Sequence, residues 1–581
     1  EKNTAMGRSS MGKNTTGVRN TSVGNQSFHE NTTGNYNVAM GHQALYNNTT
    51  ADYNTGVGYG AGGNITTGTQ NAAFGSQSLD ANSTGSNNTA VGHGALGANT
   101  TGARNTAVGT SAMTSNTTGQ RNTAMGYGAL QTYNVTDSGV DYNTAIGYSA
   151  LNSTTTGEIN TAVGGLAMET NTTGGSNVAV GYQALYANTT GGTNTAVGQA
   201  AGAATTTGSN NTFLGATSGD ANTTGTQNVA VGSAALTANT TASNNTACGF
   251  LALSANTTGA NNTSVGTSSL NAHTTGSSNT AVGKSALEAA TTSSNNTAVG
   301  SAALAANTTG TGLVAVGQAT LDANTTANYN TGIGSAALGV NTTGSNNTSV
   351  GYNSLQANTT GASSTAIGYR AGYSQSTNGQ NMFAGVEAGY SNTGYKNCFV
   401  GYQSGDEVTS GNNNTILGSY NGNQGSLDIR TADNHIVLSD GDGNPRVYVN
   451  NTGLFNVAGA YANTTGSAAN LNVDSNGWFT RSTSSLRYKN TVNDATHGLT
   501  ELLALRPVTY KSNTDGDIVF GGLIAEEVHD AGLTEFVTYN DDNQPDALAY
   551  GNMVSLCIKA IQEQQETITA LEARIAALES N

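Results

Sequence analysis

The sequence predicts a mainly β protein whose first part is a parallel β-solenoid built from 17-residue repeats. Three observations support this fold class. A pentad close to Asn-Thr-Ala-Val-Gly recurs at a fixed interval, each copy pairs a short β-compatible segment with a polar turn, and 78 glycines accompany only 9% charged residues. Beyond this shaft we expect a small β knob, an α/β domain and a C-terminal coiled-coil helix.

The repeats fill residues 1–418. The leading residue of the pentad falls at every seventeenth position from 3 to 122, then from 143 to 381 after a four-residue insertion, and finally at 397 and 414. These are 25 copies with the consensus NTAVGxxALxANTTGxx, seen clearly in residues 88–104. Positions 1 to 17 below are counted from the leading Asn of this consensus.

Each repeat predicts two short strands, Thr-Ala-Val and Ala-Leu, and a turn at Asn-Thr-Thr-Gly, whose Asn and Gly tolerate left-handed backbone conformations. Seventeen residues suit one coil of a solenoid in which coils stack at strand spacing, so 25 coils form a rod of about 120 Å. Asn at one position of successive coils can form a hydrogen-bonded ladder. The many Asn-x-Thr sequons are therefore explained by the repeat rather than by glycosylation.

The apolar content of each coil is small, with about one Val, one Leu and two or three Ala. We expect that a single chain cannot enclose a stable core with so few apolar side chains. Chains must then share a core, which predicts a homo-oligomer.

The NTAVGxxAL units resemble the head repeats of trimeric autotransporter adhesins and related repeats of phage tail fibres. The adhesin head is a trimeric left-handed parallel β-roll. The resemblance therefore implies a homotrimeric roll for residues 1–418.

Composition excludes several classes of function. The net charge of -16 and the lack of any Lys and Arg cluster argue against nucleic acid as a partner. The sequence contains no run of eighteen apolar residues, so it does not predict membrane insertion. We expect an upstream anchor because the chain begins inside a repeat. Cys248, Cys398 and Cys557 lack metal-ligand spacing, so we expect three small buried side chains, no metal and no cofactor.

A change of composition near residue 419 predicts a neck or knob over residues 419–483. Residues 434–450 alternate apolar and polar side chains around Asp440-Gly441-Asp442-Gly443-Asn444, which predicts a hairpin. The aspartates favour a turn over a calcium loop, because the downstream glutamate of such a loop is missing. Phe455, Tyr461 and Trp478 are expected in short strands, with Trp478 in core packing rather than at a receptor site.

Four ordered motifs follow, Ser484-Ser485-Leu486-Arg487-Tyr488-Lys489, residues 502–510 (LLALRPVTY), residues 522–528 (GLIAEEV) and Ala549-Tyr550. Together they resemble the intramolecular chaperone of endosialidase-type phage tail spikes and fibres, over residues 484–552. The resemblance implies that this domain trimerises the chain and then cleaves the Thr483–Ser484 bond. It implies that Ser484 is the nucleophile, Lys489 its base, and Arg487 a residue that holds the strand or stabilises the oxyanion. The family has Asp or Asn after the serine, where this chain has Ser485.

The last segment, residues 553–581, predicts a coiled-coil helix. Its heptads place Ile561, Ile568 and Ile575 at a, and they place the following residues at d: Cys557, Gln564, Leu571 and Leu578. This pattern alone does not predict three strands.

These features predict a structural fibre of a virus or phage tail that attaches to a host surface receptor, with a glycan as one candidate. The alternative is a trimeric adhesin of a bacterial or other cell surface. A glycan depolymerase is a weaker alternative because residues 1–418 contain only 14 of the 34 acidic residues. The tyrosines at variable repeat positions show no cluster in the sequence.

Overall fold

The computed structural model describes residues 2–135, 141–457, 489–513, 516–540 and 542–580, and the backbone of residues 471–473 and 479–481. The chain forms two compact units, residues 1–463 and 464–581. Each unit is described by itself.

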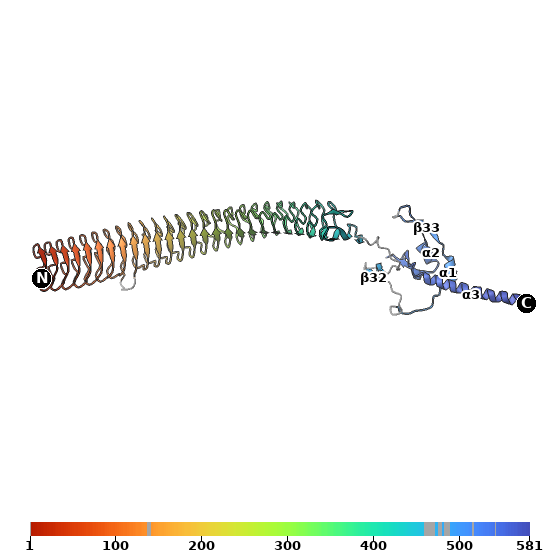
Figure 1. Cartoon of the computed structure of the whole chain (residues 1–581), viewed down its shortest axis with the longest axis horizontal. Helices are drawn as coiled ribbons and strands as arrows, with labels where there is room; N and C mark the ends of the chain where they lie inside the picture. The colour runs from red at the N-terminus through yellow and green to blue at the C-terminus, as the bar shows by residue number, and fades with distance from the viewer. Residues whose placement is uncertain are drawn as a thin grey trace. The chain divides into compact units, whose positions relative to one another are not determined.

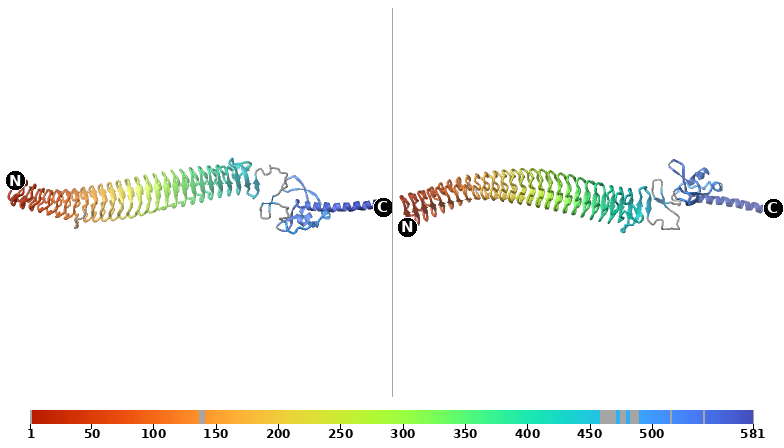
Figure 2. Two further views of the ribbon diagram at one scale, coloured as in Figure 1. Left: turned by 60° about the horizontal axis from the view of Figure 1, so that its bottom comes forward. Right: turned by 90° about the horizontal axis from the view of Figure 1, so that it is seen from above.

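The first unit is a gently curved β-solenoid in which each repeat forms one coil (Figures 1 and 2). Each coil contributes a three-residue strand at positions 2 to 4, and neighbouring strands pair in parallel with equivalent residues opposite one another, as in Thr89 opposite Thr106. The strands are β1 Thr4–Met6, β2 Thr21–Val23, β3 Val38–Met40, β4 Thr55–Val57, β5 Ala72–Phe74, β6 Thr89–Val91, β7 Thr106–Val108, β8 Thr123–Met125, β9 Thr144–Ile146, β10 Thr161–Val163, β11 Val178–Val180, β12 Thr195–Val197, β13 Thr212–Leu214, β14 Val229–Val231, β15 Thr246–Cys248, β16 Thr263–Val265, β17 Thr280–Val282, β18 Thr297–Val299, β19 Val314–Val316, β20 Thr331–Ile333, β21 Thr348–Val350, β22 Thr365–Ile367, β23 Met382–Ala384, β24 Cys398–Val400 and β25 Thr415–Leu417.

The second strand predicted for each repeat, at Ala-Leu, is wrong. The leucine at position 9 has a left-handed backbone, with φ of 52° at Leu96, which no strand accommodates. The Ala-Leu segment still bonds to the next coil, because the Leu96 N–H donates to the Ala112 carbonyl at 2.9 Å. Stacking of coils therefore satisfies backbone groups in the turns as well as in the strands.

A single chain encloses the core of the solenoid, contrary to the expectation that chains must share one. Positions 3, 8 and 9 point inward, and Ala90, Ala95 and Leu96 are fully buried. Small side chains suffice because the coil is narrow and buried asparagines occupy the rest of its interior. The thin core therefore gives no reason for trimerisation.

Two asparagine ladders run through the interior, and they confirm the predicted stacking. At position 1, the Asn88 backbone N–H donates to Asn71 Oδ1 at 3.0 Å, and Asn88 Nδ2 donates to the Gly102 carbonyl at 2.9 Å. At position 12, Asn99 Nδ2 donates to Asn82 Oδ1 at 2.7 Å. Asn99 is the asparagine of an Asn-Thr-Thr sequon, and both Asn88 and Asn99 are fully buried, so their side chains hold the coils together.

The glycine of the Asn-Thr-Thr-Gly turn serves close packing and not a left-handed backbone. A Cβ at Gly102 would collide with Asn99 Oδ1 and with the Gly119 carbonyl of the next coil. The glycine at position 5 does need its conformational freedom, since φ is 127° at Gly92.

A hairpin closes the C-terminal end of the solenoid, as the sequence predicts. β28 (Ile436–Ser439) pairs in parallel with β25 and antiparallel with β29 (Pro445–Val449), which pairs with β30 (Phe455–Val457). A second small ribbon consists of β26 (Asn423–Gln424) and β27 (Leu427–Asp428). Buried Tyr420 lies under them, and its hydroxyl donates to the Leu427 carbonyl at 2.7 Å. Apolar and backbone groups at this end of the shaft are thereby covered.

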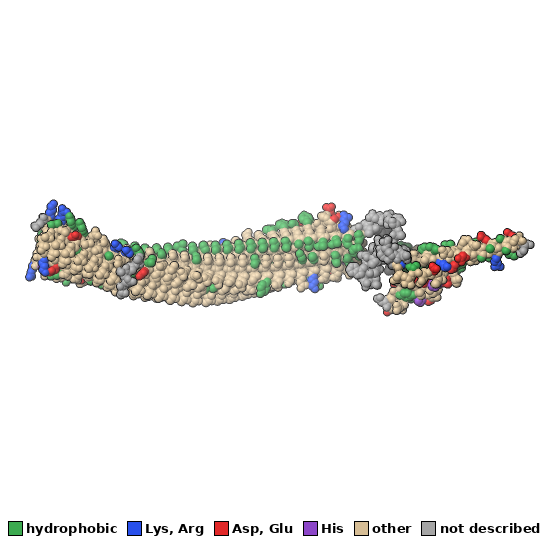
Figure 3. Space-filling view, turned by 90° about the horizontal axis from the view of Figure 1, so that it is seen from below, with side chains coloured by type: hydrophobic (Ala, Val, Ile, Leu, Met, Phe, Trp, Pro, Cys, Tyr) green, Lys and Arg blue, Asp and Glu red, His purple; other side chains and the backbone are tan. Residues whose placement is uncertain are grey.

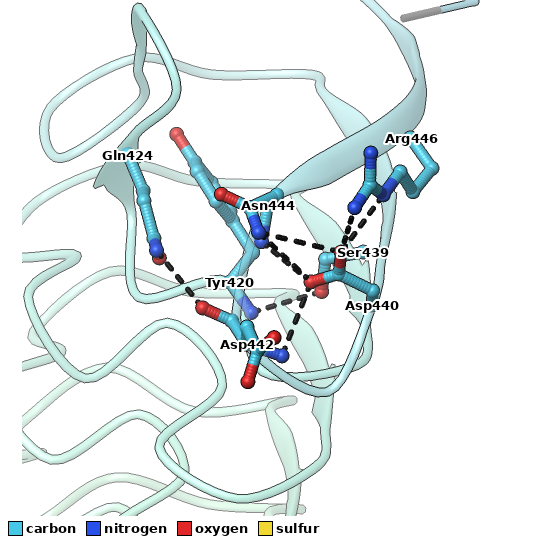
Figure 4. Close-up of polar contacts among 7 residues, drawn as sticks. All are labelled: Tyr420, Gln424, Ser439, Asp440, Asp442, Asn444 and Arg446. Carbon is cyan, nitrogen blue, oxygen red and sulfur yellow. Dashed lines mark hydrogen bonds and ion pairs between the residues drawn. The ribbon is translucent and has the colours of Figure 1, made fainter.

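The aspartate-rich segment of this hairpin is a turn, as expected. Asp440 Oδ1 accepts the N–H groups of Asp442 and Asn444 at 3.1 and 2.9 Å, and Asp440 Oδ2 pairs with the Arg446 guanidinium (Figure 4). The hydrogen bonds from Asn444, its backbone N–H first, and from Arg446 lower the pKa of the Asp440 carboxyl. Its oxygens therefore stabilise the turn directly.

The second unit is a small α/β assembly. A core of buried apolar residues joins its helices and strands, and comprises Val528, Leu533, Phe536, Val537, Met553 and Leu556. Its elements are β31 Leu471–Val473, β32 Phe479–Arg481, α1 Leu499–Ala504, β33 Val508–Lys511, β34 Val519–Gly522, α2 Ala525–Asp530, the 3₁₀ helix η2 Thr534–Phe536, β35 Val537–Tyr539, β36 Pro545–Leu548 and α3 Val554–Glu579. The pairs β31–β32, β33–β34 and β35–β36 are antiparallel. Tyr461 and Trp478 lie outside the described residues, and Phe455 is exposed in β30.

The prediction of three buried cysteines is wrong. Cys248 and Cys557 are exposed, Cys398 is partly buried, and all three are free. Cys248 occupies position 4 of its coil, which faces outward, and Cys398 occupies position 2, where most coils carry a half-buried Thr. Repeat position, rather than the burial preference of cysteine, decides their exposure.

Candidate functional site

An apolar stripe runs along the outside of the solenoid at position 4. This position is apolar in all 25 coils. Its larger side chains are exposed, with Val91 36% and Leu214 46% accessible. Figure 3 shows a row of hydrophobic side chains along the shaft. Because strands pair in register, equivalent side chains of neighbouring coils lie at strand spacing and form one continuous surface. An apolar surface of this extent marks an interaction site.

Acidic residues recur at position 10, a pattern that the sequence analysis missed. Burial raises the pKa of the carboxyls of Asp80, Asp220 and Asp322, and raises that of Asp406 to about 6. Glu169 and Glu288 occupy the same position in other coils, and no two of the six lie in adjacent coils. The column therefore offers separated carboxylates and not the paired ones that glycoside hydrolysis uses.

The described residues do not test the predicted self-cleavage site. Thr483, Ser484 and Arg487 lie outside the described residues. Lys489 is the first residue of the described segment that follows, and it is exposed. Their predicted roles therefore stay predictions.

The three downstream motifs do meet in the second unit. The Arg506 guanidinium pairs with the Glu527 carboxylate, which lies in the first turn of α2, and the Leu523 N–H donates to the Tyr550 hydroxyl at 2.7 Å. Residues of these motifs also line an apolar hollow of about 650 Å³ together with Ile558 and Ile561 of α3. The motifs thus form one folded site, and Glu527 is an ion-pair partner rather than half of a catalytic carboxylate pair.

The predicted heptad positions lie on the free surface of α3. Ile561 is 63% exposed, and Ile568, Leu571, Ile575 and Leu578 are exposed as well. A helix with such an apolar face is typical of one that packs against other helices.

Two further searches concern only the part of the chain that the structure describes. Its helices include none with the length and apolar character needed to cross a bilayer. They and the described loops bring no three His, Cys, Asp or Glu side chains into a group suited to a metal ion.

Comparisons with protein-family models, curated proteins and solved structures gave no match for this chain. The fold and these surfaces are therefore the basis for assigning a function. They define a repeat protein with a β-solenoid shaft and a small C-terminal α/β unit.

Proposed function

We propose that the chain is the structural fibre of a virus or phage tail, and that three copies associate to attach the particle to a host surface receptor. The observation that carries this proposal is the apolar stripe at position 4. Each chain already encloses its own core, so the exposed valines are available for association between chains. The number three comes from the resemblance of the repeats to trimeric adhesin heads.

The proposed fibre uses its two units differently. The shaft supplies length and a repetitive surface, and an upstream anchor joins it to the particle. The C-terminal unit acts as a chaperone, with α3 as a coiled coil that gathers three chains. After assembly the chain is cut between Thr483 and Ser484, with Lys489 as base and Arg487 in support. The proposed location is the virion, and neither nucleic acid, nor a membrane, nor a cofactor takes part.

The stripe can be tested by placing charges on it. In the variant Val282→Asp/Val299→Asp, two adjacent coils carry carboxylates where chains would meet, and desolvating them costs several kcal/mol. We expect the unaltered protein to sediment as an elongated trimer, whose chains are 58.3 kDa before the proposed cleavage, and the variant to sediment as a single chain.

The matched control is Thr267→Asp/Ser301→Asp, which adds the same charge at exposed position 6 of nearby coils. It should remain trimeric. A monomeric unaltered protein, or trimers of the stripe variant, would refute association through the stripe.

Self-cleavage needs its own test. Intact-mass measurement of assembled chains should show two fragments separated at Thr483–Ser484, at a rate independent of protein concentration. Ser484→Ala and Lys489→Ala should stop the cut, since a serine hydroxyl without its base is a weak nucleophile. Ser485→Ala should still be cut. Full-length chains after prolonged incubation would contradict the assignment.

A cell-surface adhesin remains the alternative, because the shaft and stripe would serve it equally. The gene sequence upstream of residue 1 distinguishes them, as a virion-docking domain favours the fibre and a signal peptide with a membrane anchor favours the adhesin. The isolated carboxylates at position 10 weigh against a depolymerase.

A further inference from the structure

We propose that a strip of tyrosine and polar side chains on coils 21 to 24 of the shaft, within residues 352–406, binds a glycan through neutral pyranose rings. This inference rests on the proposed attachment function and names the receptor chemistry. It is defined by six residues, which are Tyr352, Tyr369, Arg370, Tyr373, Glu387 and Tyr390.

The strip has tyrosines along both of its sides. At position 6, the rings of Tyr352 and Tyr369 stack with centroids 5.7 Å apart and planes 13° apart. At position 10, Tyr373 and Tyr390 stack at 5.1 Å and 12°. Tyr352 and Tyr369 are 50% and 42% exposed, so their rings are accessible. Stacking of adjacent coils therefore places two pairs of nearly parallel rings on the surface.

Arg370, at position 7, lies between the two pairs. Its guanidinium carbon lies 5.1 Å from the ring centroid of Tyr369, 5.8 Å from that of Tyr373 and 6.0 Å from that of Tyr390. Three rings hold one cation in place. Within the described residues its Nε is buried and has no hydrogen-bond partner. The rings hold the guanidinium in one orientation, and its terminal N–H groups, rather than the buried Nε, are the proposed donors to a ligand.

Acceptors lie beside this donor. Glu387 occupies position 7 of the next coil and accepts a hydrogen bond from Gln403 Nε2 at 3.0 Å. Asp406 continues the tyrosine column at position 10, and its Oδ1 is buried without a partner among the described groups. The strip thus presents a guanidinium, carboxylates and an amide between aromatic rings.

This combination suits a neutral sugar. The C–H face of a pyranose ring is apolar and packs on a tyrosine ring, while its hydroxyls both donate and accept hydrogen bonds. An anionic sugar fits less well, since three carboxylates, those of Glu387, Asp406 and Glu407, accompany one guanidinium in coils 22 to 24. The proximity of Glu407 and Glu387 contributes to the raised pKa of the Asp406 carboxyl.

Tyr182 provides an internal comparison. It occupies position 6 and is 52% exposed, like Tyr352, but its neighbours in that column are Gly165 and Gln199. It therefore presents one ring without a stacked partner. A ligand that needs paired rings and a guanidinium between them therefore finds neither at Tyr182.

The test is binding of the full chain to an array of neutral and acidic oligosaccharides, followed by titration of the strongest neutral one. Tyr369→Ala/Tyr373→Ala removes one ring from each side and should weaken binding at least tenfold. Arg370→Lys keeps the charge but loses the planar donors, and it should also weaken binding. Tyr182→Ala should bind as the unaltered chain does.

Three results would overturn the proposal, namely no binding to neutral glycans, a preference for acidic ones, or unchanged affinity in both strip variants. Sedimentation of the same samples tests the trimeric fibre separately from the glycan site. Trimers that bind no neutral glycan refute only the glycan site, whereas monomers that bind one through the strip refute only the trimeric fibre.

Discussion

Asparagine 88 illustrates how one residue type holds the shaft together. Its side chain accepts the Asn105 N–H at 3.0 Å and donates to the Gly102 carbonyl. Its backbone N–H donates to Asn71 Oδ1, so the residue connects three successive coils. The sequence predicts this role because Asn recurs at the same position of nearly every repeat. The pattern does not reveal the left-handed leucines or the exposed cysteines, since residue preferences say nothing of backbone angles imposed by coil closure.

We predict that Asn88→Leu destabilises the shaft locally. The substitution leaves the buried Asn105 N–H without a partner, at about 1–3 kcal/mol, and removes one of the two donors to the Gly102 carbonyl, which keeps its bond from Asn99 Nδ2. Hydrogen exchange by mass spectrometry should show faster exchange in the neighbouring coils, while distant coils keep their protection, since contacts in a solenoid join neighbours only.

The chain offers a reciprocal control at Leu313, where a buried leucine replaces the leading Asn and interrupts the ladder. Leu313→Asn should restore the hydrogen bonds and slow exchange in the neighbouring coils. Equal exchange in both variants and the unaltered chain would show that the ladder contributes little.

Asp406 predicts a pH effect. The pKa of its carboxyl rises from 3.8 to about 6, chiefly because of burial and then because of Glu407. Between these values the folded coil keeps a proton that the unfolded chain has released, so stability is greatest below about pH 4 and falls as the pH rises to 6. Asp406→Asn should remove this dependence in the last coils, as measured by hydrogen exchange at pH 4.5 and 7. If the pH dependence persists in the variant, groups other than Asp406 cause it.

At the scale of elements, the strand at positions 2 to 4 and the closing hairpin follow from the sequence. Thr-Ala-Val is a β-compatible segment, and apolar residues alternate on both sides of the Asp-Gly turn. The Ala-Leu segment has similar composition but closes the coil, and this tertiary requirement overrides its local preference. The position-10 acidic column went unnoticed because only six of 25 coils carry it.

Helix α3 predicts a test of its apolar face. Ile568→Lys places a charge at a heptad position that is exposed in one chain. If helices of three chains pack there, the charge is buried and assembly should fall sharply in sedimentation experiments. Glu566→Lys changes charge at an exposed position outside the seam and should assemble normally. Assembly of the Ile568 variant would show that α3 does not hold chains together.

At the scale of the whole molecule, the fold class follows from the repeat alone. The small apolar content of each coil, however, does not require trimers. One chain buries its own alanines and leucines, and the argument for association passes to the outward-facing residues of the same strands. The alternation of inward and outward side chains along a strand could have indicated this, because positions 2 and 4 lie on the opposite face from position 3.

Deletion of residues 484–581 tests the proposed chaperone. Chains synthesised without this segment should be monomeric or aggregated in light scattering, because nothing gathers three shafts. Shafts from which the segment is removed after assembly should stay trimeric. Native trimers from the truncated gene would contradict the role.

Identical coils raise a problem of alignment. Along the shaft every repeat strand has three residues and every coil carries an apolar residue at outward-facing position 4, so two shafts displaced by one coil lose about one contact in 25. That small difference cannot select a single alignment while contacts are still forming. The information that sets the offset between chains must come from sequence that does not repeat, and in this chain most of that sequence lies after residue 418, apart from the four-residue insertion before residue 143. The more regular the shaft, the more its correct assembly depends on the segment that differs from it.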